Sequence, residues 1–344
     1  MRTTQLGRQA DPAAATPCGQ GTMRAIVQDQ YGTAPEGVLR LAQIARPAIA
    51  ADEVLVRMRA AGVDRGTWHL MAGQPYLMRI LGFGFRGPKN PVPGLDAAGT
   101  VAAVGPQVTR FRPGDEVFGI ARGSFAEYAA AREGKLARKP ARLSFEQAAA
   151  VAVSGLAALQ GLRAGRIQAG QKVLIIGASG GVGSYAVQLA KAFGADVTGV
   201  CSTAKADLVR SAGAGHVIDY TRDDFADGRQ HYDLILDIGG NNRLSRLRRA
   251  LTPTGTLVIV GGEGAKWTGL GRQLRALALS LLVRQRLTTY VSTHRRADLD
   301  TLHQMIEAGQ ITPILGQTYP LTEAPQAIRH LQAGHARGKT AITI

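Results

Sequence analysis

The chain has 344 residues, of which 45% are hydrophobic, and its 41 Lys and Arg outnumber its 25 Asp and Glu to give a net charge of +16. This length suits two domains better than one core, and the apolar content excludes an intrinsically disordered chain. The two cysteines exclude a disulfide scaffold and a zinc site built on several thiolates.

The positive charge raises the question of a nucleic-acid or anionic-membrane partner. Most of the basic residues are arginines, and aromatic residues make up only 5% of the chain. No basic run alternates with aromatic residues, as a stacking surface for bases requires. We therefore attribute the charge to an arginine-rich composition and favour no nucleic-acid partner.

Residues 1–22 differ from the rest of the chain in composition and in their lack of an apolar pattern. They carry Arg2, Arg8 and Asp11 and have no apolar block. We expect this segment to be a disordered extension rather than a secretory signal. No apolar run in the chain approaches the roughly 20 residues of a membrane-spanning helix. The prediction that follows is a cytoplasmic protein.

Residues 23–146 have the pattern of a β-domain. Residues 53–60 alternate between apolar and polar side chains, as a half-buried strand does. Short apolar stretches are separated by glycines, which are Gly94, Gly99, Gly105, Gly114, Gly119 and Gly123. Closely spaced short strands of this kind predict a partly open, barrel-like antiparallel fold.

Residues 147–297 alternate between strand and helix patterns. Ser144 and Gln147 predict a capping box at a helix start just before this region. Residues 172–176 are an apolar, β-branched run typical of a buried parallel strand. Helices are expected at 154–162, 184–193, 204–212 and 243–251, and further strands at 196–201, 216–218, 233–238 and 256–260. This alternation predicts an α/β fold with a doubly wound parallel sheet, the Rossmann architecture.

Residues 298–344 form a third stretch. Two helices are expected, at 299–308 and 323–333, followed by an extended run at 339–344. We predict that this last run returns to the N-terminal β-domain and pairs with it.

The most specific motif is a glycine-rich loop directly after the strand at 172–176 and directly before a helix. It consists of Ala178, Ser179, Gly180, Gly181, Val182 and Gly183. This is the dinucleotide fingerprint with alanine at its first glycine position: Gly180 lets the backbone approach a pyrophosphate, and Gly183 lets helix and strand pack closely. The helix N-terminus then faces the phosphates with its positive dipole end.

The end of the next strand indicates which dinucleotide binds. NAD-binding proteins place Asp or Glu there to hold the ribose 2′-hydroxyl. Here the strand ends without an acidic residue and is followed by Ser202, Thr203 and Lys205. Two hydroxyls and a cation suit a 2′-phosphate, so we predict NADPH.

Several landmarks in order resemble the medium-chain dehydrogenase/reductase superfamily, in its zinc-free quinone oxidoreductase branch. They are the segments 92–99, 113–119 and 123–128, the glycine-rich loop, Asp219 with Tyr220, and Gly338 with Lys339. The resemblance covers nearly the whole chain from Met23. It implies a GroES-like catalytic domain beside a Rossmann NADP-binding domain.

The resemblance also bears on zinc. Zinc-dependent members have a Cys where this chain has Asp64, and a His where it has Leu95. The four-cysteine structural zinc lobe is missing as well. One remaining carboxylate cannot hold zinc in a tetrahedral N/S site, so we predict no metal.

The resemblance implies a set of site residues. Tyr76 would polarise a carbonyl or donate a proton, with Asp64 and Thr67 facing the same cleft; His69 is interpreted as structural. The cofactor would also contact residues beyond the glycine-rich loop, namely Ser154, Tyr220, Gly239, Val260, Gly261, Gly262 and Lys339.

Without a metal, the best-supported chemistry is hydride transfer from NADPH to a quinone or an α,β-unsaturated carbonyl. Two alternatives stay open. One is a zinc-free alcohol dehydrogenase or biosynthetic reductase of one specialised metabolite. The other is an NADPH-binding protein with a role on nucleic acid or a membrane surface.

Residues 270–287 form a basic stretch with a broad apolar face, predicted to be a helix. It suits a substrate-pocket lid, a dimer interface or peripheral membrane contact, and we favour the first two. Relatives often dimerise through the following strand, here near 289–291, so a homodimer is expected. Residues 78–91 are predicted to form a second wall of the site.

Overall fold

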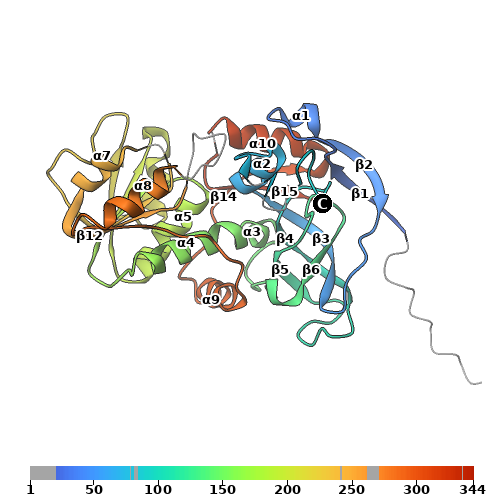
Figure 1. Ribbon diagram of the computed structural model, residues 1–344. Helices are drawn as coiled ribbons and strands as arrows, with labels where there is room; N and C mark the ends of the chain where they lie inside the picture. Colours follow the sequence, from blue (N-terminus) through green and yellow to red (C-terminus); the bar gives the residue numbers. More distant parts are fainter. Residues whose placement is uncertain (1–20, 78, 81–83, 241, 262–270, 335) are drawn as a thin grey trace, which may run out of the picture.

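The computed structural model describes residues 21–344 except 78, 81–83, 241, 262–270 and 335. Two domains lie side by side, one rich in β-strands and one built on a parallel sheet with helices (Figure 1). None of the described helices is both long and apolar enough to cross a bilayer.

The β-rich domain contains a seven-stranded sheet in the order β14-β15-β3-β4-β5-β7, with β6 also paired to β3, and a two-stranded sheet of β1 and β2. Its strands are β1 Thr22–Val27, β2 Arg40–Ala45, β3 Glu53–Val63, β4 Asp96–Val104, β5 Glu116–Ile120, β6 Tyr128–Arg132, β7 Leu136–Arg138, β14 Leu315–Pro320 and β15 Lys339–Thr343. Its helices are α1 Pro35–Val38, α2 Arg65–Ala72, α3 Phe145–Ala149 and α10 Ala324–Gln332. β1 thus starts at Thr22, one residue inside the predicted extension; residues 1–20 lie outside the described part of the chain.

The second domain is a Rossmann fold. Its six parallel strands are ordered β10-β9-β8-β11-β12-β13, so the strand order reverses between β8 and β11. The strands are β8 Lys172–Ile176, β9 Asp196–Cys201, β10 His216–Asp219, β11 Tyr232–Asp237, β12 Leu251–Ile259 and β13 Arg286–Thr289. The helices are α4 Ala152–Ala164, α5 Gly181–Ala192, α6 Ala206–Ser211, α7 Leu244–Arg249, α8 Gly271–Ser280 and α9 Arg296–Glu307.

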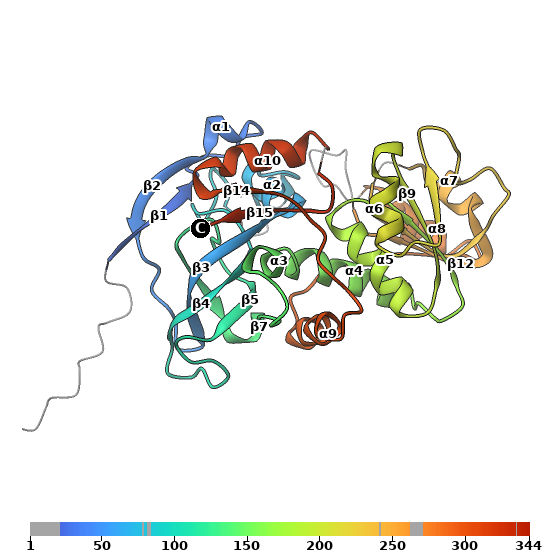
Figure 2. The ribbon, with the colours of Figure 1, turned by 180° about the vertical axis from the view of Figure 1, so that it is seen from behind.

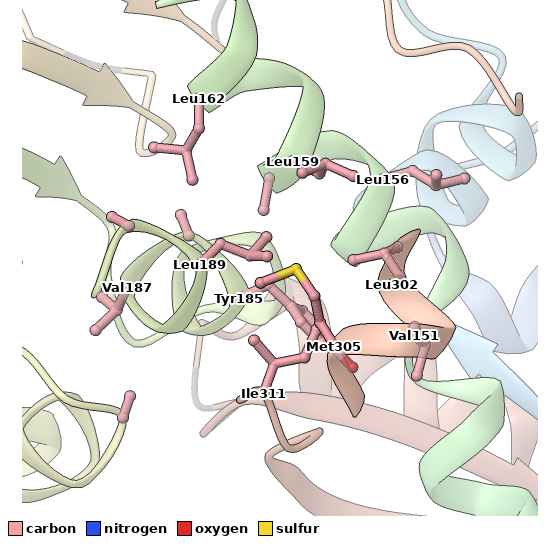
Figure 3. Packing of buried hydrophobic residues seen from close by; sticks show 14 of the residues in the cluster. Val151, Leu156, Leu159, Leu162, Tyr185, Val187, Leu189, Leu302, Met305 and Ile311 are labelled. Atoms are coloured by element: carbon pink, nitrogen blue, oxygen red, sulfur yellow. The ribbon is translucent and has the colours of Figure 1, made fainter. Parts of the chain in front are cut away.

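The largest core cluster joins the two domains. Leucines of α4 pack against Tyr185 of α5 and against Leu302 and Met305 of α9 (Figure 3). The predicted capping box at Ser144 and Gln147 is present and starts α3 just before this core. Because α3 and α4 run from one domain into the other, burial of their apolar faces fixes how the domains meet.

The last strand crosses back to the first domain. β15 pairs antiparallel with β3, with Thr340 opposite Val63, as the sequence predicts. Figure 2 shows β15 beside β3, although the two are far apart in the chain. The residues just before β15 are thereby carried past the edge of the Rossmann domain.

The predicted helix over 270–287 is wrong in its second half. α8 ends at Ser280, and residues from Arg286 form β13, the outer strand of the parallel sheet. The Ser280 hydroxyl oxygen accepts a hydrogen bond from the Leu287 N–H, 2.9 Å away, which closes the turn between helix and strand. The homodimer through this region stays a prediction.

Candidate active site

The glycine-rich loop has the geometry that its sequence predicts. α5 starts at Gly181 with Gly180 as its N-cap. A side chain at Gly183 would place Cβ 2.1 Å from the Gly177 carbonyl oxygen, so only glycine lets the helix approach the strand this closely. At Gly180 the nearest atom to such a Cβ is 3.5 Å away, which leaves its outer face open to a ligand. Ala178 and Ser179, the first two residues of the loop, are buried.

A cavity of about 340 Å³ opens in front of this loop, between the two domains. It lies at the reversal of strand order, where Gly177 follows β8 and Gly239 follows β11, the usual place for a ligand in such sheets. Eight of the predicted site residues line it, namely Asp64, Ser154, Gly180, Gly181, Val182, Lys205, Gly239 and Lys339.

The floor of the cavity holds a buried ion pair. Lys339 Nζ lies 2.9 Å from Asp96 Oδ2, with side-chain exposures of 2% and 0%. The other oxygen, Asp96 Oδ1, accepts a hydrogen bond from the Val153 N–H at 2.7 Å. The Lys339 stem packs under the loop, since a Cβ at Gly181 would lie 2.8 Å from Lys339 Cδ and 3.1 Å from Ser154 Oγ. This pair therefore joins β15, β4, α4 and the glycine-rich loop.

Burial raises the pKa of Asp96 to about 6, although Lys339 and the Val153 N–H favour its charged form. Burial also lowers the pKa of Lys339, but Asp96 and Asp64 outweigh this and leave it above its ordinary value. Lys339 is therefore a cation throughout the physiological range, whereas Asp96 takes up a proton in mildly acidic conditions.

Asp64 stands beside this pair at the start of α2. Its Oδ1 accepts from the Thr67 N–H at 2.8 Å and lies 3.4 Å from the Thr67 hydroxyl, so Asp64 is the helix N-cap. Its Oδ2 is buried and has no hydrogen-bond partner among the described residues. An unsatisfied carboxylate oxygen lining a cavity is an acceptor available to a ligand.

Two cations lie close together at the outer end of the cavity: Lys205 lines it, and Arg337 lies beside Lys205. Lys205 Nζ donates to the carbonyl oxygens of Gly334 and Ala336, at 2.7 and 2.9 Å. Arg337 donates to the Ala204 carbonyl oxygen and, through Nη2, to both carboxylate oxygens of Asp207. Burial lowers the pKa of Lys205, and the nearby Arg337 lowers it further.

The hydroxyls predicted at this end are placed differently. The Thr203 hydroxyl donates to Asp219 Oδ2 and is occupied. Ser202 is half-buried and precedes a short 3₁₀ helix at Thr203–Lys205. Tyr220 is 60% exposed, and its backbone N–H donates to the Cys201 carbonyl oxygen. Lys205 and Arg337 are thus the groups that would bind a phosphate, by exchanging their hydrogen bonds to protein oxygens for hydrogen bonds to the phosphate.

On the opposite side, Val260 and Gly261 follow β12. A Cβ at Gly261 would lie 2.5 Å from the Ile238 carbonyl oxygen, so glycine is required there. The Gly261 carbonyl oxygen accepts from Arg272 Nη2 at 3.1 Å, and Arg272 also pairs with the fully buried Asp237. Gly262 lies outside the described residues.

Tyr76 is not among the residues that line the cavity. The guanidinium of Arg79 lies 4.7 Å from the centre of its ring. His69 Nδ1 is 3.0 Å from the Gln74 carbonyl oxygen. The described part of the 78–91 loop contacts the N-terminal segment, where the Tyr31 hydroxyl donates to the Gly84 carbonyl oxygen. None of the described residues of this loop lines the cavity, whereas Leu331, Gly334 and Ala336 do.

Sequence reasoning missed three residues at the site, Asp96, Arg272 and Arg337. Asp96 enters the sequence analysis only within the landmark segment 92–99. Arg337 directly precedes the matched pair Gly338 and Lys339, and this position is a signal for it. For Arg272 no local signal exists, because its partner Asp237 is 35 positions away.

Among the described residues that line the cavity, Asp64 is the one His, Cys, Asp or Glu side chain. Asp64 and Leu95 occupy the two places where zinc-dependent relatives have ligands, and Asp96 is already paired with a cation. Within the described residues, no three His, Cys, Asp or Glu side chains lie close enough together to hold a metal ion.

Comparisons with known proteins agree with this architecture. Residues 50–141 match the family described as alcohol dehydrogenase GroES-like domain, and residues 212–342 match zinc-binding dehydrogenase. The chain is 31% identical to a quinone oxidoreductase of Sus scrofa over 94% of this chain and 97% of that protein. It is 32% identical to an NADPH-dependent alkenal/one oxidoreductase of Arabidopsis thaliana over 93% of this chain and 79% of that protein.

A solved structure named quinone oxidoreductase from Coxiella burnetii aligns with a TM-score of 0.83 and 26% identity, covering 94% of this chain and 100% of that one. The GroES-like domain, the Rossmann sheet and the matches over almost the full length all indicate the same superfamily. The chain belongs to the medium-chain dehydrogenase/reductase superfamily and is an oxidoreductase of the group that includes quinone oxidoreductases and enone reductases.

Proposed function

We propose that the protein is a zinc-independent, NADPH-dependent reductase of quinones or α,β-unsaturated carbonyls. One observation favours NADPH over NADH. Lys205 and Arg337, one from each domain, lie close together beside the end of β9, which has no acidic residue. The names of the pig and Arabidopsis relatives support the acceptor class.

The residues present fit this cofactor. The loop at Gly180–Gly183 and the N-terminus of α5 would hold the pyrophosphate, and Lys205 and Arg337 the 2′-phosphate. Small side chains at the nicotinamide end, namely Ser154, Gly239, Val260 and Gly261, would leave room for the ring. When bound, NADPH supplies a hydride.

The chain's own residues would guide the proton. A quinone or enone that accepts a hydride needs one proton to complete a two-electron reduction. Water that enters the cavity gives this proton and leaves hydroxide to the solvent, while Asp64 Oδ2 accepts a hydrogen bond from the water and orients it. Thr67 keeps the carboxylate oriented by donating its N–H to Oδ1. Lys339 lies close enough to Asp64 to balance its charge.

Tyr76 keeps its proposed role as a hydrogen-bond donor to the acceptor oxygen. This role requires its hydroxyl to reach an acceptor that extends beyond the cavity described above. Tyr76→Phe removes only the hydroxyl, so we expect kcat to fall while the Kd for NADPH stays unchanged.

The test is loss of NADPH absorbance in stopped flow with 1,4-benzoquinone, a naphthoquinone and a short 2-alkenal, with NADH in parallel. Turnover with a strong preference for NADPH is expected. Asp64→Asn keeps a helix-capping residue but removes the carboxylate that orients the water, so kcat should fall about a hundredfold with NADPH binding retained. Tight NADPH binding without turnover of any acceptor would contradict the proposed acceptor class.

A further inference from the structure

A group of leucines on α8 and the turn after it points away from the protein. Leu274, Leu277 and Leu281 are spaced three and four residues apart, which places them along one side of the helix. Leu281 and the adjacent Leu282 are 87% and 83% exposed, among the most exposed large apolar residues described. We call these four residues the α8 patch. Clustered apolar surface of this kind marks an interaction site.

The position of α8 does not depend on these leucines. The opposite side of the helix is anchored by the fully buried Ala276 and by Arg272, which pairs with Asp237. Ser280 closes the following turn onto Leu287. Figure 1 shows α8 in the Rossmann half of the molecule, away from the β-rich domain. The contacts that hold α8 in place therefore come from the side of the helix opposite the patch, as far as the described residues show.

The exposed charged residues next to the patch along the chain are basic. Arg275 and Arg284 are exposed and have no acidic partner among the described residues. Arg248 of α7 joins them, since its Nε donates to Gln285 in the same turn at 3.0 Å. The sequence has no Asp or Glu between positions 264 and 297.

We propose that the α8 patch docks on an anionic lipid membrane, with the leucines entering the headgroup boundary and Arg275 and Arg284 contacting lipid phosphates. Apolar side chains ringed by arginines match such a surface in both polarity and charge. A second copy matches it less well, because an interface formed by this patch on both copies would bury two sets of these arginines, and the sequence around them offers no acidic residue to pair with. This surface is separate from the cavity, so the docking does not rest on the proposed reaction.

The test is co-sedimentation of the full chain with vesicles of phosphatidylglycerol and phosphatidylcholine, compared with vesicles of phosphatidylcholine alone. Binding to the anionic vesicles is expected, and it should disappear in about 1 M salt, where charges are screened over roughly 3 Å. Leu281→Ser/Leu282→Ser and Arg275→Gln/Arg284→Gln should each weaken binding at least about tenfold.

Matched controls sit on the other domain. Leu41→Ser and Arg57→Gln change an exposed leucine and an exposed arginine of the β-rich domain and should leave binding unchanged. Equal binding to both kinds of vesicle, or full binding by either α8 double variant, would overturn the proposal. So would a dimer in light scattering that the leucine variant splits while no vesicles are bound, since the patch would then belong to a second copy.

Discussion

The two ends of the cavity use charge in opposite ways. At the floor, Lys339 and Asp96 are almost fully buried and bonded to each other. At the outer end, Arg337 is 47% exposed and bonded to surface oxygens of the other domain. Buried charges that lose a partner are costly, whereas exposed charges exchange partners cheaply. The ion pair at the floor therefore stabilises the junction of the two domains, whereas the cations at the outer end are available for a ligand.

The sharpest test of the floor is removal of its cation. Lys339→Met leaves Asp96 and Asp64 without a balancing charge, so the free energy of unfolding should fall by about 3 to 5 kcal/mol. Urea denaturation measures this. Replacing the pair together, as Lys339→Met/Asp96→Leu, should recover most of the loss. A single variant as stable as the parent would mean that the pair does not stabilise the junction of the domains.

The outer end should respond in binding rather than in stability. Lys205→Gln and Arg337→Gln should each raise the Kd for NADPH about tenfold to a hundredfold, because each removes a charged hydrogen bond to the 2′-phosphate. The Kd for NADH should change little, and calorimetric titration measures both. Arg222→Gln, an exposed cation that lies 3.8 Å from Asp219 on the same edge, is the matched control. Equal losses for NADH and NADPH would argue against a 2′-phosphate site.

Two glycines of the glycine-rich loop should also differ, one acting on stability and the other on binding. Gly183→Ala forces a Cβ against the Gly177 carbonyl oxygen and should lower stability by about 1 to 3 kcal/mol. Gly180→Ala meets no protein atom closer than 3.5 Å, so it should leave the melting temperature unchanged and weaken only dinucleotide binding. Thermal unfolding with and without NADPH separates the two effects. The interpretation fails if both variants melt alike without cofactor.

The smallest expected effect is on pH dependence. The pKa of Asp96 is about 6 in the folded chain and near 3.9 in an unfolded one, so the folded state binds the extra proton between these values. This contribution is fully present below the unfolded pKa and is lost as the pH rises through about 6. The parent should therefore gain about 1 to 2 kcal/mol between pH 7 and pH 5 relative to Asp96→Asn. Urea titrations at both pH values check this, and parallel curves would contradict it.

What the sequence predicts well is local. The loop from Ala178 to Gly183 combines a strand, a turn and a helix start within a few residues, so its fold and its ligand class follow from short-range geometry. The floor is different: Asp96 and Lys339 are 243 positions apart. Their contact exists only because β15 pairs with β3, which no local pattern specifies. The helix expected through 287 failed for a similar reason, because the edge of the sheet recruits Arg286–Thr289 as a strand.

The return of β15 also has a consequence for biosynthesis. Lys339 is synthesised long after Asp64 and the glycine-rich loop, yet all of them line the same cavity. The Rossmann sheet can assemble while the ribosome is still translating, but the Lys339 side chain can pack under Gly181 only after residue 339 has left the exit tunnel. We therefore expect that a nascent chain stalled before that point cannot retain its dinucleotide. Binding of the cofactor would then be one of the last steps in the biosynthesis of this enzyme.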